Sequence, residues 1–231
     1  MNIFILAGGF GTRLRSVVSD VPKPMAFINE EPFLEYQIKN IRMAFPLNTI
    51  YLLTYYKSEV IEKYYENQKN IKVIKESKPL GTGGSVVNAI RKLGLKSQDS
   101  LLVFNGDTYL EVDLLTMIDS SKYDLTILSS LQEDCSRYGT LEIKNDTIFD
   151  FKEKVEVCKN SYINAGCYYF KSLEFFNDDY KLNSSFSLEL QFEKYVKKNK
   201  IGVMRYESIF IDIGIPEDYE KMKFYIGSER E

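Results

Sequence analysis

The order of apolar and polar positions predicts alternating strands and helices over the first half of the chain. Residues 2–7 form a short apolar run that ends at a glycine pair, as is typical of a buried strand. From Pro32, apolar residues recur on one face at helical spacing. Further runs predict strands at 49–55, 71–74 and 101–104 and helices at 57–67 and 85–93. This alternation indicates a parallel sheet with helices on both faces.

The pattern of apolar positions changes after the predicted strand at 101–104. Four strand-like runs follow with few helical residues between them, at 125–131, 139–143, 147–152 and 162–170. A helix at 188–198, strands at 201–206 and 210–213, and a helix beginning at Pro216 complete the chain. We interpret the later strands as an antiparallel elaboration of the same sheet. The predicted fold class is therefore α/β, with a Rossmann-like mixed, mainly parallel central sheet.

Composition and charge narrow the class of partner. The chain has 231 residues and a formal net charge of −3, which argues against a nucleic-acid binder. No stretch approaches the roughly 20 apolar residues of a membrane span, and the first residues lack the basic and apolar regions of a secretory signal. We expect a cytoplasmic protein with neither a nucleic-acid nor a membrane partner. The sequence leaves open whether the protein forms a homodimer.

The chain contains no histidine, which excludes Ser-His-Asp catalysis, histidine bases and His-ligated zinc. Any metal would be held by oxygen ligands, which favours Mg²⁺. The three cysteines, Cys135, Cys158 and Cys167, are odd in number and contain no CxxC motif. This spacing predicts neither a disulfide framework nor a zinc site, and it agrees with a reducing cytosol.

A glycine-rich segment directly follows the first predicted strand. Its glycines would let backbone N–H groups approach an anion. The segment matches neither a Walker A loop nor a dinucleotide fingerprint, because no Gly-Lys-Ser/Thr follows and Leu14 replaces the third glycine. A tight turn is the competing interpretation. Arg13 and Lys23 add two cations near the loop, and this combination suits a polyphosphate better than a plain turn.

Three more segments fall at the ends of predicted strands. A second glycine-rich loop, residues 79–84, follows one strand, and Asn105-Gly106-Asp107 follows another. In an open α/β sheet, ligands bind beyond the carboxyl ends of the strands. Asp212 lies within an apolar strand, where an ionised carboxylate is costly unless it is paired or metal-bound. Asp107 and Asp212 are therefore candidate Mg²⁺ ligands, although an Asx turn also explains the first of them.

Taken in order, these segments resemble the motif set of the sugar-1-phosphate nucleotidylyltransferases. The resemblance runs over nearly the whole chain and also includes Glu153-Lys154 and Asn164-Ala165-Gly166. Within that family, Pro22 to Ala26, the 79–84 loop and Arg137 to Thr140 are most similar to the D-glycero-α-D-manno-heptose 1-phosphate guanylyltransferases. One departure is Val155, where many members have proline. The resemblance implies a single domain, 1–231, with a nucleotide-binding half at 1–107 and a sugar-binding half at 108–231.

The resemblance also implies roles, residue by residue. The reaction would transfer a nucleoside monophosphate to a sugar 1-phosphate, either GMP from GTP or the monophosphate of another NTP. Arg13 and Lys23 would be the catalytic residues. Asp107 and Asp212 would hold Mg²⁺. The nucleotide would contact Leu6, Ala7, Gly8, Gly9, Gly11, Thr12, Arg13, Lys23, Glu76, Pro79, Leu80, Gly81, Thr82, Asn105 and Gly106. The sugar phosphate would contact Gly139, Glu153, Lys154, Asn164 and Gly166.

Several alternatives stay open at this point. The substrate could be another sugar 1-phosphate, of the mannose, glucose or N-acetylmuramate type. A non-catalytic nucleotide-sugar-binding relative should lack one of the four charged residues with proposed roles in the chemistry. None is missing here: Arg13, Lys23, Asp107 and Asp212. A glycosyltransferase with an Asp-x-Asp motif is disfavoured because Asn105 and Tyr109 flank Asp107 at that spacing. Glu76 could read the guanine base or could be a solvated acid at a strand end. In the second case, backbone groups at Leu80 to Thr82 could read the base instead.

Overall fold

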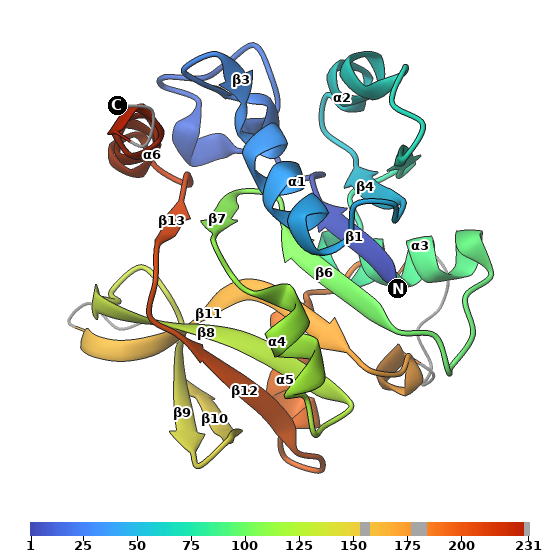
Figure 1. The fold of residues 1–231 in the computed structure, drawn as a ribbon, viewed down its shortest axis with the longest axis vertical. Helices are drawn as coiled ribbons and strands as arrows, with labels where there is room; N and C mark the ends of the chain where they lie inside the picture. The colour runs from blue at the N-terminus through green and yellow to red at the C-terminus, as the bar shows by residue number, and fades with distance from the viewer. Residues whose placement is uncertain (153–157, 177–183, 229–231) are drawn as a thin grey trace. The chain divides into compact units, whose positions relative to one another are not determined.

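The computed structural model describes residues 1–152, 158–176 and 184–228. These residues form two compact units (Figure 1). The N-terminal unit comprises Ile3–Pro79, Phe104–Val112 and Ile209–Glu231. The central unit comprises Met1–Asn2, Leu80–Val103 and Asp113–Ser208. The N-terminal unit carries the first glycine loop and both candidate metal ligands.

Three parallel strands form the sheet of the N-terminal unit, in the order β5-β4-β1. They are β1 (Asn2–Leu6), β4 (Ile50–Thr54) and β5 (Ile71–Lys75). Helix α1 (Phe33–Ala44) precedes β4, and helix α2 (Ser58–Tyr65) joins β4 to β5. Ile3, Phe4 and Ile5 are fully buried, so side chains on both faces of β1 are covered. Strands buried in this way read as continuous apolar runs, which is why the sequence predicts them well.

A second part of the N-terminal unit brings distant segments together. Strand β13 (Phe210–Asp212) pairs antiparallel with β7 (Thr108–Leu110), and the short strands β2 (Phe27–Ile28) and β3 (Glu31–Pro32) pair with each other. Helix α6 (Pro216–Ser228) follows β13 (Figure 1). One buried cluster joins these elements: Leu14, Ala26, Ile28, Phe33, Tyr36, Tyr109, Ile211, Ile213, Tyr219, Met222 and Ile226. The cluster fixes the segments on which the candidate site residues lie.

The central unit contains the antiparallel elaboration. Its strands follow the order β6-β11-β8-β12-β10-β9, where β6 (Leu101–Asn105) begins in this unit and ends in the N-terminal unit. The others are β8 (Leu125–Asp134), β9 (Thr140–Lys144), β10 (Thr147–Lys152), β11 (Lys159–Phe170) and β12 (Ile201–Tyr206). Strand β8 is antiparallel to β11 and parallel to β12. Helices α3 (Gly81–Leu93), α4 (Leu114–Asp119) and α5 (Leu188–Tyr195) complete the unit.

The fold class is α/β with a mixed sheet, as the sequence predicts. The short strands β2, β3 and β7 and the short helix α4 were not expected. Their patterns are too short to give a period. Helix α4 is instead capped by Asp113, whose carboxylate accepts hydrogen bonds from the Leu115 and Thr116 N–H groups. Among the described residues, no helix is long and apolar enough to cross a membrane.

Candidate functional site

The first glycine loop leaves the end of β1 in the N-terminal unit. The Ala7 N–H still donates to Leu53 O at 2.8 Å, so the chain departs from the sheet at Gly8. A Cβ on Gly8 would lie 3.2 Å from Tyr55 N, which explains why a small residue stands there. Gly11 has φ +59°, in the left-handed region that favours glycine, and caps a 3₁₀ turn formed by Thr12–Leu14. The loop is therefore held at both of its ends.

Arg13 lies within that 3₁₀ turn and is exposed. The next residue, Leu14, is 1% exposed and belongs to the buried cluster, so it anchors the turn. This alternation presents the guanidinium of Arg13 to solvent beside the glycine loop. The arrangement can serve an anion on the open side of the loop, since nothing lies within 4 Å of the position that a Cβ on Gly9 would take.

Lys23 and Asp107 form an ion pair in the structure. Lys23 Nζ donates to Asp107 Oδ2 at 2.6 Å, between residues 84 positions apart. The side chains are 12% and 33% exposed, so the pair is partly shielded from water. Pro22 and Pro24 flank Lys23, and the backbone of Lys23 lies in the 3₁₀ turn Lys23–Met25. This turn fixes the direction in which the lysine side chain projects. A candidate phosphate-binding cation and a candidate metal-binding acid are therefore neighbours.

The turn that carries Asp107 packs directly against the end of β1. Gly106 donates its N–H to Leu6 O at 3.0 Å. A Cβ on Gly106 would lie 2.6 Å from that oxygen, closer than real Cβ atoms come to backbone. Glycine is thus required at position 106 by close approach of two backbones, and this approach sets where Asp107 stands.

We expect Gly106→Ala to destabilise the protein, because Leu6 O cannot move away without disturbing β1. The expected loss of unfolding free energy is about 1–3 kcal/mol, the usual cost of overpacking. Gly9→Ala is the matched control, because open space surrounds that position. Urea unfolding of both variants measures the effect. Equal midpoints for the two variants would contradict this account of Gly106.

Asp212 stands at the end of β13, opposite the Asp107 turn. Asp212 pairs in register with Thr108, and the Ile213 N–H donates to Asp107 O at 3.0 Å. The backbones of the two acids are therefore side by side, although they are far apart in sequence. A Cβ on Gly214 would lie 3.0 Å from Asp212 Oδ1, so the glycine leaves room for that carboxylate.

Two carboxylates suit a cation that substrate also binds. Within the described ranges, no group of three or more His, Cys, Asp or Glu side chains could hold a metal. Mg²⁺ is commonly bound by one or two carboxylates together with substrate phosphates and water. Asp107 and Asp212 therefore fit Mg²⁺ brought in with a nucleotide, and they do not fit a closed structural metal site.

The residues predicted to read the base fall on two segments. Glu76 is 6% exposed, and its N–H donates to Thr54 O at 2.9 Å. The interpretation of Glu76 as a solvated acid is therefore wrong, because the end of β5 turns it inward. Pro79 closes this segment of the N-terminal unit and is exposed.

The second glycine loop is not a loop after Leu80. Helix α3 begins at Gly81, four residues before the predicted start at residue 85. Phe186 explains the glycines, because its backbone or ring contacts any Cβ placed on Gly81 or Gly83, and its carbonyl accepts from the Gly83 N–H at 3.0 Å. Close packing rather than helix propensity decides this end. Thr82 Oγ1 also caps α5, accepting from the Leu188 N–H at 2.8 Å.

The predicted sugar-binding residues belong to the central unit. Asn164 and Gly166 share a bulge in β11, where Gly166 has φ +72° and donates its N–H to Asn164 Oδ1 at 2.9 Å. Asn164 Nδ2 also donates to Tyr168 Oη at 3.0 Å. Gly139 directly precedes β9. Glu153 and Lys154 lie outside the described residues.

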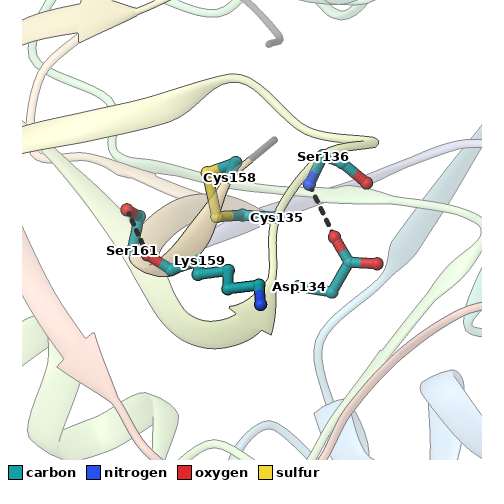
Figure 2. The surroundings of a disulfide bond; sticks show 6 residues. All are labelled: Asp134, Cys135, Ser136, Cys158, Lys159 and Ser161. Carbon is teal, nitrogen blue, oxygen red and sulfur yellow. Dashed lines mark hydrogen bonds between the residues drawn. A yellow bond between two sulfur atoms is a disulfide. The ribbon is translucent and has the colours of Figure 1, made fainter. Parts of the chain in front are cut away.

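A disulfide links Cys135 to Cys158, contrary to the expectation from cysteine spacing (Figure 2). Asp134 at the end of β8 pairs with Lys159 at the start of β11, and the Cys135 N–H donates to Cys158 O at 3.2 Å. Strand pairing therefore places the two cysteines opposite each other across 23 residues, which no sequence motif reveals. The expectation that these cysteines form no disulfide is therefore wrong.

We expect thiol counting to confirm this pairing on protein purified without reductant. Cys167 is buried, and burial raises the pKa of its thiol, so the native protein should react slowly with a thiol reagent. Unfolding without reductant should expose one thiol, and unfolding with reductant should expose three. Three reactive thiols in the unreduced, unfolded protein would contradict the pairing.

Known proteins are similar to this chain over nearly its full length. A family model described as nucleotidyl transferase matches residues 3–227. The chain belongs to the nucleotidyl transferase family. It is 37% identical to the D-glycero-α-D-manno-heptose 1-phosphate guanylyltransferase of Campylobacter jejuni, over 95% of this chain and 97% of that protein. It is 38% identical to the protein of the same name from Aneurinibacillus thermoaerophilus, over 96% of each chain.

Solved structures of other proteins show the same fold. HddC from Yersinia pseudotuberculosis, complexed with GMP-PN, is 34% identical and gives a TM-score of 0.81 over 97% of this chain and 99% of that one. The inositol-1-phosphate CTP transferase of T. maritima gives a TM-score of 0.78 at 18% identity, which shows the fold alone. Membership of the family, predicted from the motifs, is therefore confirmed.

Proposed function

We propose that this nucleotidyl transferase moves GMP from GTP to D-glycero-α-D-manno-heptose 1-phosphate, giving GDP-heptose and pyrophosphate, and that it works in the cytoplasm. The observation that carries the proposal is the Lys23–Asp107 ion pair. It joins a cation that follows the glycine loop to an acid beside Asp212, within one unit. Identity of 37–38% to two heptose 1-phosphate guanylyltransferases, over nearly the full length of each, supports the choice of substrates.

The chemistry needs no general base. The attacking oxygen belongs to a phosphate monoester, whose second pKa is about 6, so it is already anionic near neutral pH. The difficulty is to bring two anions together and hold them in line for attack on the α-phosphorus of GTP. A chain without histidine can do this, because the task is electrostatic and geometric.

Positive charge in the N-terminal unit performs that task. Lys23 would neutralise the α-phosphate, and exposed Arg13 would bind the β- and γ-phosphates and stabilise the leaving pyrophosphate. Backbone N–H groups around Gly8, Gly9 and Gly11 would hold the phosphates from the loop. Asp107 and Asp212 would hold Mg²⁺, which supplies charge neutralisation and a template for the phosphates when bound.

The sugar 1-phosphate is proposed to bind the central unit. By resemblance, Lys154 contacts its phosphate, and Gly139, Glu153, Asn164 and Gly166 contact sugar hydroxyls. The amide of Asn164 is already fixed by its hydrogen bonds with Gly166 and Tyr168. Asn164 is therefore pre-oriented, a property that lowers the cost of ordering a polar contact when substrate binds.

Base selection is proposed to involve Glu76. Guanine presents N1–H and N2–H₂ donors together, and one carboxylate can accept from both. A buried acid that satisfies those donors rejects bases that lack them, by up to roughly 10⁴-fold. The low exposure of Glu76 supports this role, because a solvated carboxylate would discriminate weakly.

The test is to measure kcat/KM for GTP, ATP, UTP, CTP and dTTP with the heptose 1-phosphate. Pyrophosphate release is the assay. We expect a clear preference for GTP, reduced in Glu76→Gln. Equal or better use of CTP or UTP would contradict guanylyl transfer. Mannose 1-phosphate is the competing sugar, since a Xenopus tropicalis mannose-1-phosphate guanylyltransferase subunit is 30% identical, although this chain covers only 66% of it. A higher kcat/KM for mannose 1-phosphate would contradict the heptose assignment.

A further inference from the structure

Gln37 on helix α1 reaches the turn that carries Asp107. Its side chain is buried, with the residue 5% exposed. Nε2 donates to Asn105 O at 2.8 Å and to Thr108 O at 3.0 Å. An amide NH₂ has two hydrogens, and both are used here. The two accepting carbonyls lie on either side of Gly106 and Asp107, so one side chain closes this turn from outside.

The orientation of this amide is fixed by its surroundings. The reverse orientation would place Oε1 against two carbonyl oxygens, which repel it. The Gly106 N–H is meanwhile bound to Leu6 O, and Asp107 O accepts from the Ile213 N–H. With Gln37 added, each residue from Asn105 to Thr108 has a backbone group tied to another element. Little freedom is left in the backbone that presents the Asp107 carboxylate.

A second amide on the same helix provides an internal comparison. Asn40 is three residues further along α1, and its Nδ2 donates to Leu110 O at 3.0 Å. Both amides therefore anchor α1 to the β7 region, one at each end of the strand. The difference is position, because only the Gln37 anchor brackets Asp107. A general role in packing would make the two residues equivalent, and a role at the site would separate them.

We propose that Gln37 is a positioning residue, which acts through the Asp107 turn to set the carboxylate for Mg²⁺. The proposal deepens the proposed function and rests on Asp107 as a metal ligand. Groups that orient a metal ligand typically change metal affinity or activity by 10- to 100-fold when they are lost. Gln37→Met removes both donors at nearly constant size, and Asn40→Leu is its matched control.

The experiment measures metal binding without turnover. Mn²⁺ is titrated into protein saturated with GTP, with no sugar phosphate present, and binding is read from water-proton relaxation. We expect Gln37→Met to weaken Mn²⁺ binding by roughly 10-fold or more. Asn40→Leu should keep an Mn²⁺ affinity within about twofold of the wild type, even if its unfolding temperature falls as far as that of Gln37→Met. If Gln37→Met does not fold, Gln37→Asn keeps the amide but shortens its reach, and the same weakening is expected.

Three results would overturn the proposal. A folded Gln37 variant with wild-type Mn²⁺ affinity would do so, and so would equal weakening in Asn40→Leu, which would indicate general destabilisation. An unchanged affinity in Asp107→Asn, run alongside, would remove the metal ligand itself. None of these depends on product formation. A protein that binds Mn²⁺ as expected but makes no GDP-heptose would instead contradict the proposed function.

Discussion

Asp107→Asn and Asp212→Asn are each expected to lower kcat by about 10²-fold or more, with the protein still folded. The expected size follows from weaker binding of the Mg²⁺ that would neutralise the transferring phosphate, because losing one preorganised group that stabilises transition-state charge costs about that much. Asparagine keeps the size of each side chain, so the change isolates charge. A site with one carboxylate fewer should also need more Mg²⁺ for half-maximal rate.

Asp20→Asn is the matched control for these variants. Asp20 is an exposed acid of the same unit, and its carboxylate accepts a hydrogen bond from the neighbouring Ser19 hydroxyl at 2.9 Å. Its loss should leave the rate unchanged. Steady-state rates at several Mg²⁺ concentrations, with circular dichroism to check folding, decide the matter. A near-wild-type rate at ordinary Mg²⁺ for either aspartate variant would show that the residue is not a ligand.

Lys23→Ala is expected to have the second large effect, a loss mainly in kcat of about 10²-fold or more. Charge on the transferring phosphate grows in the transition state, so a cation placed there acts more on rate than on ground-state binding. The variant also leaves Asp107 without the ammonium that lies 2.6 Å away. Arg13→Ala should lose kcat as well, because pyrophosphate gains charge as it leaves.

Lys39→Ala separates this effect from the simple loss of a lysine. Lys39 forms an exposed ion pair with Glu31 in the same unit. Exposed pairs of this kind contribute about 1 kcal/mol or less to stability. We expect normal kcat and KM for Lys39→Ala. A Lys23→Ala enzyme that keeps its kcat and loses only GTP affinity would contradict a role in the transition state.

The sequence alone predicts much of this fold because several segments have a clear period. The strand expected at 71–74 appears as β5, and the helix expected from Pro32 appears as α1. The glycine loop with Arg13 and Lys23 could also be recognised from the sequence as a candidate phosphate site. Packing alone gives no reason for two cations beside such a loop. The division of the chain into nucleotide- and sugar-binding halves, and the roles of individual residues, stay predictions.

The features that sequence reasoning missed depend on contacts between distant segments. The early start of α3 requires Phe186, which is about a hundred residues away and leaves no local signal. The Cys135–Cys158 disulfide depends on the register of β8 with β11. Gln37 reads as one polar position on an otherwise apolar helix face, and only its two hydrogen bonds distinguish it from a tolerated core amide.

The most direct measurement of the central claim is product identification from GTP, D-glycero-α-D-manno-heptose 1-phosphate and Mg²⁺. Phosphorus NMR of the reaction, with mass spectrometry of the nucleotide product, follows every phosphate. We predict that GDP-heptose and pyrophosphate form in equal amounts and that GTP remains intact without the sugar phosphate. Release of GDP and orthophosphate, or no nucleotide sugar at all from folded protein, would contradict the account.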